Sequence, residues 1–212
     1  MRILVTGATG YIGGRLVPRL VAAGHEVVCL ARTPDKLDGL LWRGDVEVVR
    51  GDVLDAAGLK EAAAGCDAAY YLVHSMAAGK EFADEDRQAA ANFRDAADAA
   101  GMKRIVYLGG LGPEDDDLSP HLASRHEVGH VLAGGATPVT ELRAAVVIGS
   151  GSLSFEMLRY LTEVLPVMTT PRWVRTRCQP IAVEDVRDLR GEAIEAAAGP
   201  GRGGEIRSRI NN

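Results

Sequence analysis

The feature that most constrains this chain is a glycine-rich turn, Gly7 to Gly13, that separates a strand pattern from a helix pattern. Arg2–Thr6 is a short apolar run, and the residues after the turn place apolar side chains at helical spacing: Ile12, Leu16 and Leu20. Gly24 is typical of a helix C-terminus, and Glu26–Ala31 is a second apolar run. The first 31 residues therefore predict one strand–helix–strand unit.

The same alternation continues along the chain. Between the fourth and fifth apolar runs lies an alanine-rich helix pattern, Glu85–Ala100, and the runs that we expect to be the third to sixth strands are Val46–Arg50, Ala68–Val73, Arg104–Leu108 and Val139–Val147. Strands that are apolar on both faces and alternate with helices form a parallel sheet covered on both sides. The predicted fold class is therefore α/β, a doubly wound parallel sheet with helices on both faces.

Composition and charge exclude several classes of protein. The chain has 212 residues, 47% hydrophobic and 25% charged, which is typical of one globular domain and not of a disordered or fibrous segment. The formal charge of −5 argues against a nucleic-acid-binding surface. No uncharged run exceeds 13 residues, so we expect no membrane-spanning helix. The early glycines leave no room for a signal peptide and the three cysteines are odd in number, so we expect a cytoplasmic protein.

The glycine turn also predicts a ligand. Glycines between a strand and a helix let a pyrophosphate approach the helix N-terminus, where N–H groups and the helix dipole favour an anion. The strand, the helix and the complete unit around the turn are the context that supports such a motif. The alternative is that the glycines only pack the helix on the strand. We expect dinucleotide binding by Gly7, Thr9, Gly10, Tyr11, Ile12 and Gly13.

The end of the second strand bears on which dinucleotide is bound. An NAD site normally has a carboxylate there, which bonds the ribose 2′-hydroxyl. This chain has Arg32 instead, with Lys36 close behind, and a guanidinium suits a 2′-phosphate. The sequence thus favours NADP over NAD, with a solvated arginine as the alternative interpretation.

The segment Thr6–Gly14, TGATGYIGG, resembles the atypical and extended short-chain dehydrogenase/reductase superfamily, including its NAD(P)-binding NmrA-like group, and the similarity runs to about residue 206. The resemblance implies a Rossmann-like fold. It also implies that Asp52 and Val53 meet the adenine, that Leu72, Val73 and His74 line the cofactor, and that Gly109 and Gly110 end the fifth strand beside it.

The chain departs from that family where the catalytic residues are expected. Relatives have a serine after the fifth strand, where this chain has Gly109 and Gly110, and their Tyr-x-x-x-Lys falls on His121 and Arg125. His121 could relay a proton and Arg125 could hold the ribose or a phosphate. The resemblance therefore implies an oxidoreductase that transfers hydride to or from a small-molecule substrate. The alternative is a non-catalytic protein that senses NAD(P) and reports to a partner protein.

Three regions are expected along the chain. Residues 1–149 form the NAD(P)-binding Rossmann domain, 150–200 a small, incomplete substrate-side region, and 201–212 a flexible tail. The middle region contains a predicted helix, Phe155–Leu165, and a predicted strand, Pro180–Val183. Because relatives continue further, we expect the substrate pocket to be small, open, or completed by a second copy, a partner protein or missing sequence.

A competing motif lies within the predicted catalytic helix. His126–His130 reads HEVGH, which matches the HExxH pattern of zinc peptidases, in which two histidines bind Zn²⁺ and the glutamate activates water. A catalytic zinc needs a third protein ligand, and the positions where the longer pattern would need glycine and histidine are Ala133 and Ala136. We therefore expect no metal site.

Overall fold

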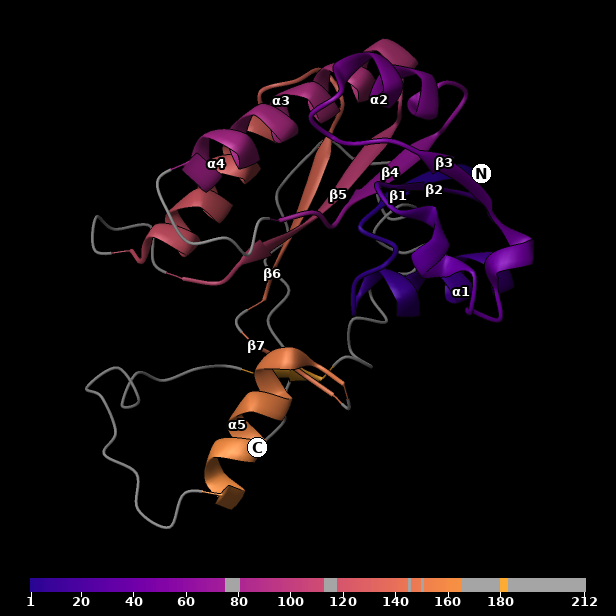
Figure 1. Ribbon diagram of the computed structural model, residues 1–212. Helices are drawn as coiled ribbons and strands as arrows, with labels where there is room; N and C mark the ends of the chain where they lie inside the picture. The colour runs from indigo at the N-terminus through magenta and orange to yellow at the C-terminus, as the bar shows by residue number, and fades with distance from the viewer. Residues whose placement is uncertain (75–80, 113–117, 145, 150, 165–179, 183–212) are drawn as a thin grey trace.

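The computed structural model describes residues 1–74, 81–112, 118–144, 146–149, 151–164 and 180–182. Its centre is a six-stranded, fully parallel sheet, which confirms the predicted fold class (Figure 1). The strands, in their spatial order, are β3 (Glu47–Arg50), β2 (Glu26–Ala31), β1 (Arg2–Thr6), β4 (Ala68–Tyr71), β5 (Arg104–Gly110) and β6 (Val139–Ala144). From β1 the chain adds β2 and β3 on one side and β4 to β6 on the other, so the winding of the sheet reverses between β1 and β4. The carboxyl ends of these two strands therefore border a crevice.

Helices cover both faces of the sheet. On one face lie α2 (Ala56–Ala63), α3 (Glu81–Ala100) and α4 (Pro120–Ala133), and on the other lies α1 (Gly13–Ala22), followed along the chain by the short 3₁₀ turns η1 (Pro34–Leu37) and η2 (Arg43–Asp45) (Figure 1). None of the helices in the described part of the chain is long and apolar enough to cross a bilayer.

The strands bury alternate side chains in two cores, one on each face. In β1, Leu4 packs under α2, α3 and α4, whereas Ile3 and Val5 pack against α1. The same alternation in β4 sends Tyr71 to the first core and Tyr70 to the second, and both are fully buried. Burial on both faces explains why these strands are continuous apolar runs in the sequence.

Two of the helices begin at capping side chains. Asp55 caps α2, where its Oδ1 accepts hydrogen bonds from the backbone N–H groups of Ala57 and Gly58. Ser119 caps α4, where its hydroxyl oxygen accepts from the N–H of Leu122, and Pro120 occupies the first turn. These caps satisfy N–H groups that a helix leaves without internal partners.

The sixth predicted strand is divided in the structure, so the single strand Val139–Val147 is wrong. β6 ends at Ala144, and β7 (Val146–Ile148) pairs with β8 (Pro180–Ala182) in a separate two-stranded sheet. Ala144 is the register partner of Gly110, the last residue of β5, and its carbonyl oxygen accepts from the N–H of Leu111 at 3.0 Å.

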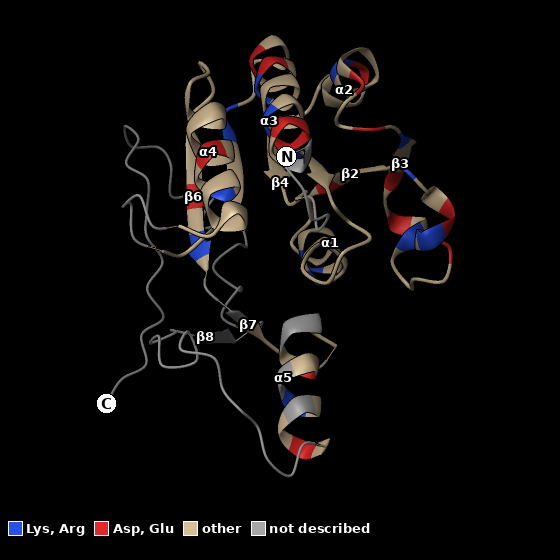
Figure 2. Ribbon diagram, turned by 60° about the vertical axis from the view of Figure 1, so that its left-hand side comes forward, with Lys and Arg blue, Asp and Glu red and all other residues tan. Residues whose placement is uncertain are grey.

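The segment after the main sheet is a small separate layer. The predicted helix is α5 (Leu153–Val164), which lies with β7 and β8 away from the six-stranded sheet (Figure 2). The predicted strand corresponds to β8, and its last expected residue, Val183, lies outside the described residues. The division into three regions stays a prediction, because residues 165–179 and 183–212, including the expected tail, lie outside the described residues.

One buried amide joins α3 to the loop that follows β3. The side-chain nitrogen of Asn92 donates to the carbonyl oxygens of Val53 and Leu54, both at 3.1 Å. Its side-chain oxygen accepts from Gln88 Nε2 at 2.8 Å. Since a loop carbonyl buried without a donor is costly, Asn92 fixes the position of this loop against the helix.

We expect Asn92→Ala to lower the free energy of unfolding by about 1–3 kcal/mol, because it leaves two loop carbonyls without donors. The matched control is Gln88→Ala, which removes a bond to Asn92 but keeps both bonds to the loop, and should cost less than about 0.5 kcal/mol. Urea denaturation of the three proteins measures both values. Equal losses in the two variants would show that the amide does not hold the loop.

Candidate functional site

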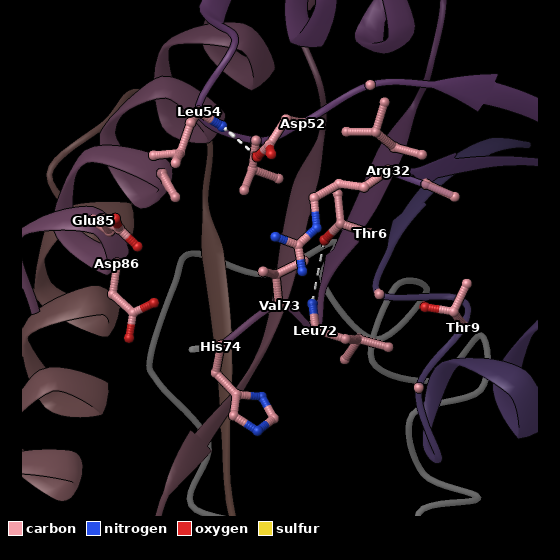
Figure 3. Close-up of a pocket in the computed structure, with 17 residues that line it drawn as sticks. Thr6, Thr9, Arg32, Asp52, Leu54, Leu72, Val73, His74, Glu85 and Asp86 are labelled. Atoms are coloured by element: carbon pink, nitrogen blue, oxygen red, sulfur yellow. Dashed lines mark hydrogen bonds between the residues drawn. The ribbon is translucent and has the colours of Figure 1, made fainter. Parts of the chain in front are cut away.

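A cavity of about 440 Å³ opens at the carboxyl ends of β1, β2 and β4, at the crevice where the strand order reverses (Figure 3). Open parallel sheets bind ligands at this place. Nine of the residues predicted to bind a cofactor line it: Gly7, Thr9, Gly10, Arg32, Asp52, Val53, Leu72, Val73 and His74. The sheet thus brings together side chains from four separate strand ends.

The floor of the cavity is held by Thr6, the last residue of β1. Its hydroxyl donates to the carbonyl oxygen of Tyr70 at 3.2 Å and accepts from the backbone N–H of Leu72 at 3.3 Å (Figure 3). Thr6 is fully buried, so both bonds are shielded from water. They extend the pairing of β1 and β4 beyond the last ladder residues, and they fix the chain that leads to His74.

The glycine turn brings α1 close to the end of β1. Gly7 has φ of +77°, a left-handed conformation, and a Cβ there would lie 3.0 Å from the Leu72 carbonyl oxygen. A Cβ on Gly13 would overlap the carbonyl oxygen of Gly7. The chain therefore needs glycine at both positions, and the N-terminus of α1 points at the space beside the turn. These features fit a pyrophosphate, whose charge the backbone N–H groups and helix dipole would bind.

One end of the cavity has the features of an adenosine pocket. The guanidinium of Arg32 points into the cavity from the end of β2 (Figure 3). Asp52 follows β3, and its Oδ1 accepts from the N–H of Leu54 at 3.0 Å, which turns the loop under the cavity. Val53 is buried there and Leu54 supplies an apolar wall. The arrangement suits a flat base beside Val53 and Leu54 and an anion beside Arg32.

Sequence reasoning missed the wall that α3 contributes, which consists of Glu85, Asp86 and Ala89. Asp86 is 9% exposed, and its Oδ2 accepts from the buried hydroxyl of Ser124 on α4 at 3.1 Å. The signal in the sequence is the spacing of Glu85 and Ala89, which places them one turn apart on the same side of a helix. Only the packing of α3 on the sheet shows that this side faces the cavity.

The two candidate histidines lie next to each other but differ in their access to the cavity. Both side chains are exposed, but His74 lines the cavity, whereas His121 on α4 does not. Their ring centroids are 6.2 Å apart and the rings are nearly perpendicular. The pKa of His74 is lowered to about 4, first by desolvation and then by the positive charges of Arg125 and His121, which outweigh the opposite effect of Asp86.

Gly109, Gly110 and Arg125 lie behind the cavity and do not line it. A Cβ on Gly109 would overlap Glu141 Oε1, and one on Gly110 would overlap Leu122 Cδ1 and lie 3.3 Å from Arg125 Cδ. A serine at either place would therefore require its neighbours to move. Arg125 is further held by its backbone carbonyl, which accepts from the hydroxyl of Tyr107 at 2.9 Å.

The other four predicted cofactor residues, Tyr11, Ile12, Gly13 and Lys36, also lie outside the cavity lining. Tyr11 packs under the guanidinium of Arg15, whose carbon is 3.9 Å from the ring centroid. Ile12 directly precedes α1, without a side-chain capping bond, and packs on the second core. Lys36 is exposed in η1. Their roles in cofactor binding stay predictions.

The HEVGH residues face different partners. His126 is buried, and its Nε2 lies 3.2 Å from the carbonyl oxygen of Gly110. Glu127 forms an ion pair with Arg87 of α3 at 2.6 Å, and His130 is exposed. No group of three or more metal-ligating side chains occurs among the residues that the structure describes. The motif thus packs α4 against β5 and α3.

Comparison with known proteins identifies the family. The family model described as NAD(P)H-binding matches residues 7–159. The chain is 32% identical over 206 residues to (4-alkanoyl-5-oxo-2,5-dihydrofuran-3-yl)methyl phosphate reductase of Streptomyces griseus subsp. griseus. The matched segment covers 95% of this chain and 65% of that protein. It is 30% identical over 118 residues to cinnamoyl-CoA reductase 1 of Oryza sativa subsp. japonica, and this match covers 52% of this chain and 34% of the rice protein.

Two solved structures show the same fold. WbmG of Bordetella bronchiseptica, in complex with NAD, matches with a TM-score of 0.78 at 20% identity, over 97% of this chain and 72% of that chain. Triphenylmethane reductase of Citrobacter sp., complexed with NADP(H), matches with a TM-score of 0.61 at 28% identity, over 77% of this chain and 55% of that chain. At 20% identity the first likeness concerns the fold.

The match to the family model begins at the glycine turn and extends over most of the six-stranded sheet. The chain spans 65% of the length of the Streptomyces reductase and 34% of the rice reductase. Strand order, glycine turn, cavity and family model all indicate the same cofactor class. The chain belongs to the NAD(P)H-binding family, within the superfamily of short-chain dehydrogenase/reductase-like proteins, and its cofactor is a nicotinamide dinucleotide.

Proposed function

We propose that the protein is an NADP-dependent reductase of small conjugated carbonyl compounds. The observation that carries the proposal is the cavity at the β1–β4 crevice, which combines the glycine turn with an arginine directed into it from β2. The reductases among the similar proteins support hydride transfer as the reaction.

The choice of NADP rests on the charge at the end of β2. Arg32 stands where an NAD site would have a carboxylate, and a guanidinium can donate two hydrogen bonds to a phosphate. Among the described lining residues it is the one permanent cation, beside the carboxylates of Asp52, Glu85 and Asp86. Asp52 follows β3 and the other two lie on α3, so a 2′-phosphate would find its favourable partner at Arg32.

The substrate class rests on what the site lacks. Neither Gly109 nor Gly110 can supply the hydroxyl that polarises a simple ketone. The name of the Streptomyces relative describes a ring double bond conjugated to two carbonyl groups. Such a double bond accepts hydride at carbon and spreads the resulting charge over its own oxygens. A substrate of this kind needs less help from protein hydrogen-bond donors.

We propose that a residue of α4 supplies the proton that completes the reduction. The family resemblance puts His121 at the position of the relatives' tyrosine, and Arg125 lies one turn later on the same helix. We assign proton supply to His121 and a contact with the cofactor ribose or phosphate to Arg125. The short distance between the His121 and His74 rings supports this assignment, because it connects α4 to the cavity.

Replacing Arg32 tests the cofactor preference. We expect wild-type protein to bind NADPH more tightly than NADH, and Arg32→Ala to weaken NADPH binding by about 10-fold or more while NADH binding changes little. Lys60→Ala, on exposed α2, removes the same charge away from the cavity and should leave both affinities unchanged. Isothermal titration calorimetry gives the dissociation constants. Equal affinities in the wild type would contradict the choice of NADP.

Replacing the α4 pair tests the chemistry. We expect His121→Phe to lower kcat by about 10²- to 10⁴-fold, which is typical of a lost general acid, and to leave the Kd for NADPH unchanged. Arg125→Ala should instead mainly raise that Kd. NADPH oxidation is followed by absorbance with cyclohexenone and an unsaturated lactone. Tight NADPH binding without oxidation of NADPH by any such compound would favour the sensor over the reductase.

A further inference from the structure

We propose that His74 delivers the proton to the substrate and that His121 reloads His74 from solvent, so that the two imidazoles form a relay between the cavity and the protein surface. The inference rests on the proposed reductase. It deepens that function by separating two tasks, contact with the substrate and exchange with water, which a single tyrosine would perform in relatives.

The position of His74 carries the first half of the relay. It follows β4, directly after Leu72 and Val73, on the edge of the sheet where the cavity opens (Figure 3). The Thr6 hydroxyl holds the N–H of Leu72, so the chain that carries His74 is fixed to β1. In the close-up the imidazole extends away from the end of the cavity that holds Arg32 and Asp52 (Figure 3). It therefore stands on the side left for the reacting part of a dinucleotide and its substrate.

The position of His121 carries the second half. It lies in the first turn of α4, whose start is fixed by the Ser119 cap, and its side chain is exposed. It does not line the cavity, so His121 by itself has no direct route to a substrate bound there. The edge of one ring faces the other at a centroid distance of 6.2 Å. A water molecule bonded to one nitrogen of each ring would complete the path between them.

The charges around His74 suit a relay. Arg125 and His121 face it from α4, Asp86 faces it from α3, and Glu85 lines the same cavity. The two groups on α4 and desolvation dominate, so the pKa of His74 is lowered to about 4 and its ring is neutral above that pH. A neutral imidazole has one N–H donor and one acceptor nitrogen, so it can give a proton from one side and receive one on the other.

A reduced nicotinamide held in the cavity would supply a hydride to one carbon of the substrate double bond, and the electron pair of that double bond would move onto the conjugated oxygen. The N–H bond of His74 breaks as its proton passes to the resulting enolate. At the same time the other nitrogen of His74 takes a proton from the imidazolium of His121, through one water. His121 then regains a proton from a solvent acid, so one proton is consumed for each hydride.

Three variants test the relay with cyclohexenone as the substrate probe. We expect His74→Gln and His121→Ala each to lower kcat by about 10²-fold or more, with the Kd for NADPH unchanged in both. The double variant should be no slower than His74→Gln, because both residues lie on one path. His130→Gln is the matched control, since it removes an exposed histidine from the same helix and should keep full activity.

Chemical rescue distinguishes the two roles. Imidazole added to the buffer should restore turnover in His121→Ala, where the alanine leaves the position of the ring open, and should fail to restore it in His74→Gln, where the glutamine side chain still occupies the position of the ring. Full activity in His74→Gln, together with lost activity in His121→Ala, would overturn the relay and leave the reductase intact. Failure of the wild type to oxidise NADPH with this probe and an unsaturated lactone would overturn the proposed reductase itself.

A measurement without substrate checks the coupling directly. In NMR titrations of the imidazole resonances, His121→Ala should raise the pKa of His74, because it removes a like charge from beside the ring. His130→Gln should leave that pKa unchanged. A His74 pKa that is the same in wild type and His121→Ala would show that the rings are uncoupled, and would overturn the relay whether or not the protein reduces the probe.

Discussion

The approach of α1 to the end of β1 is the contact on which the site depends. The Cα of Gly13 packs against the carbonyl of Gly7 so closely that no side chain fits between them. This contact directs the N-terminus of α1 at the cavity and allows Leu16 to pack under β1. The course of the turn and the placement of α1 therefore depend on two residues without side chains.

The opposite wall depends on polar contacts between helices. Asp86 accepts from Ser124 across the α3–α4 interface, and Asn92 holds the loop after β3. Both groups are buried, so each bond is costly to break. Together they place α3 and α4 relative to the sheet, and α4 carries His121 and Arg125. The candidate chemistry thus depends on contacts that lie beside the cavity as much as on residues inside it.

The glycines at the end of β5 show how a departure from a family pattern can be explained by packing. The sequence shows only that serine is missing at Gly109 and Gly110. In the structure Glu141 fills the space beside Gly109, and Leu122 and Arg125 fill the space beside Gly110. A side chain at Gly109 or Gly110 would therefore require the end of the Glu141 or Leu122 side chain to move.

The sequence by itself determined what depends on near neighbours in the chain. The strands, the helix periodicity, the glycine turn and Arg32 at the end of β2 are all local patterns, and nine predicted cofactor residues line the cavity. Only the tertiary structure decided which distant elements meet. Strand order and helix packing decide where α3 forms a wall and where β6 ends, at Ala144. They also bring His74 close to His121, although α3 and β5 lie between these two residues along the chain. Those depend on long-range burial, which leaves no local trace in the sequence.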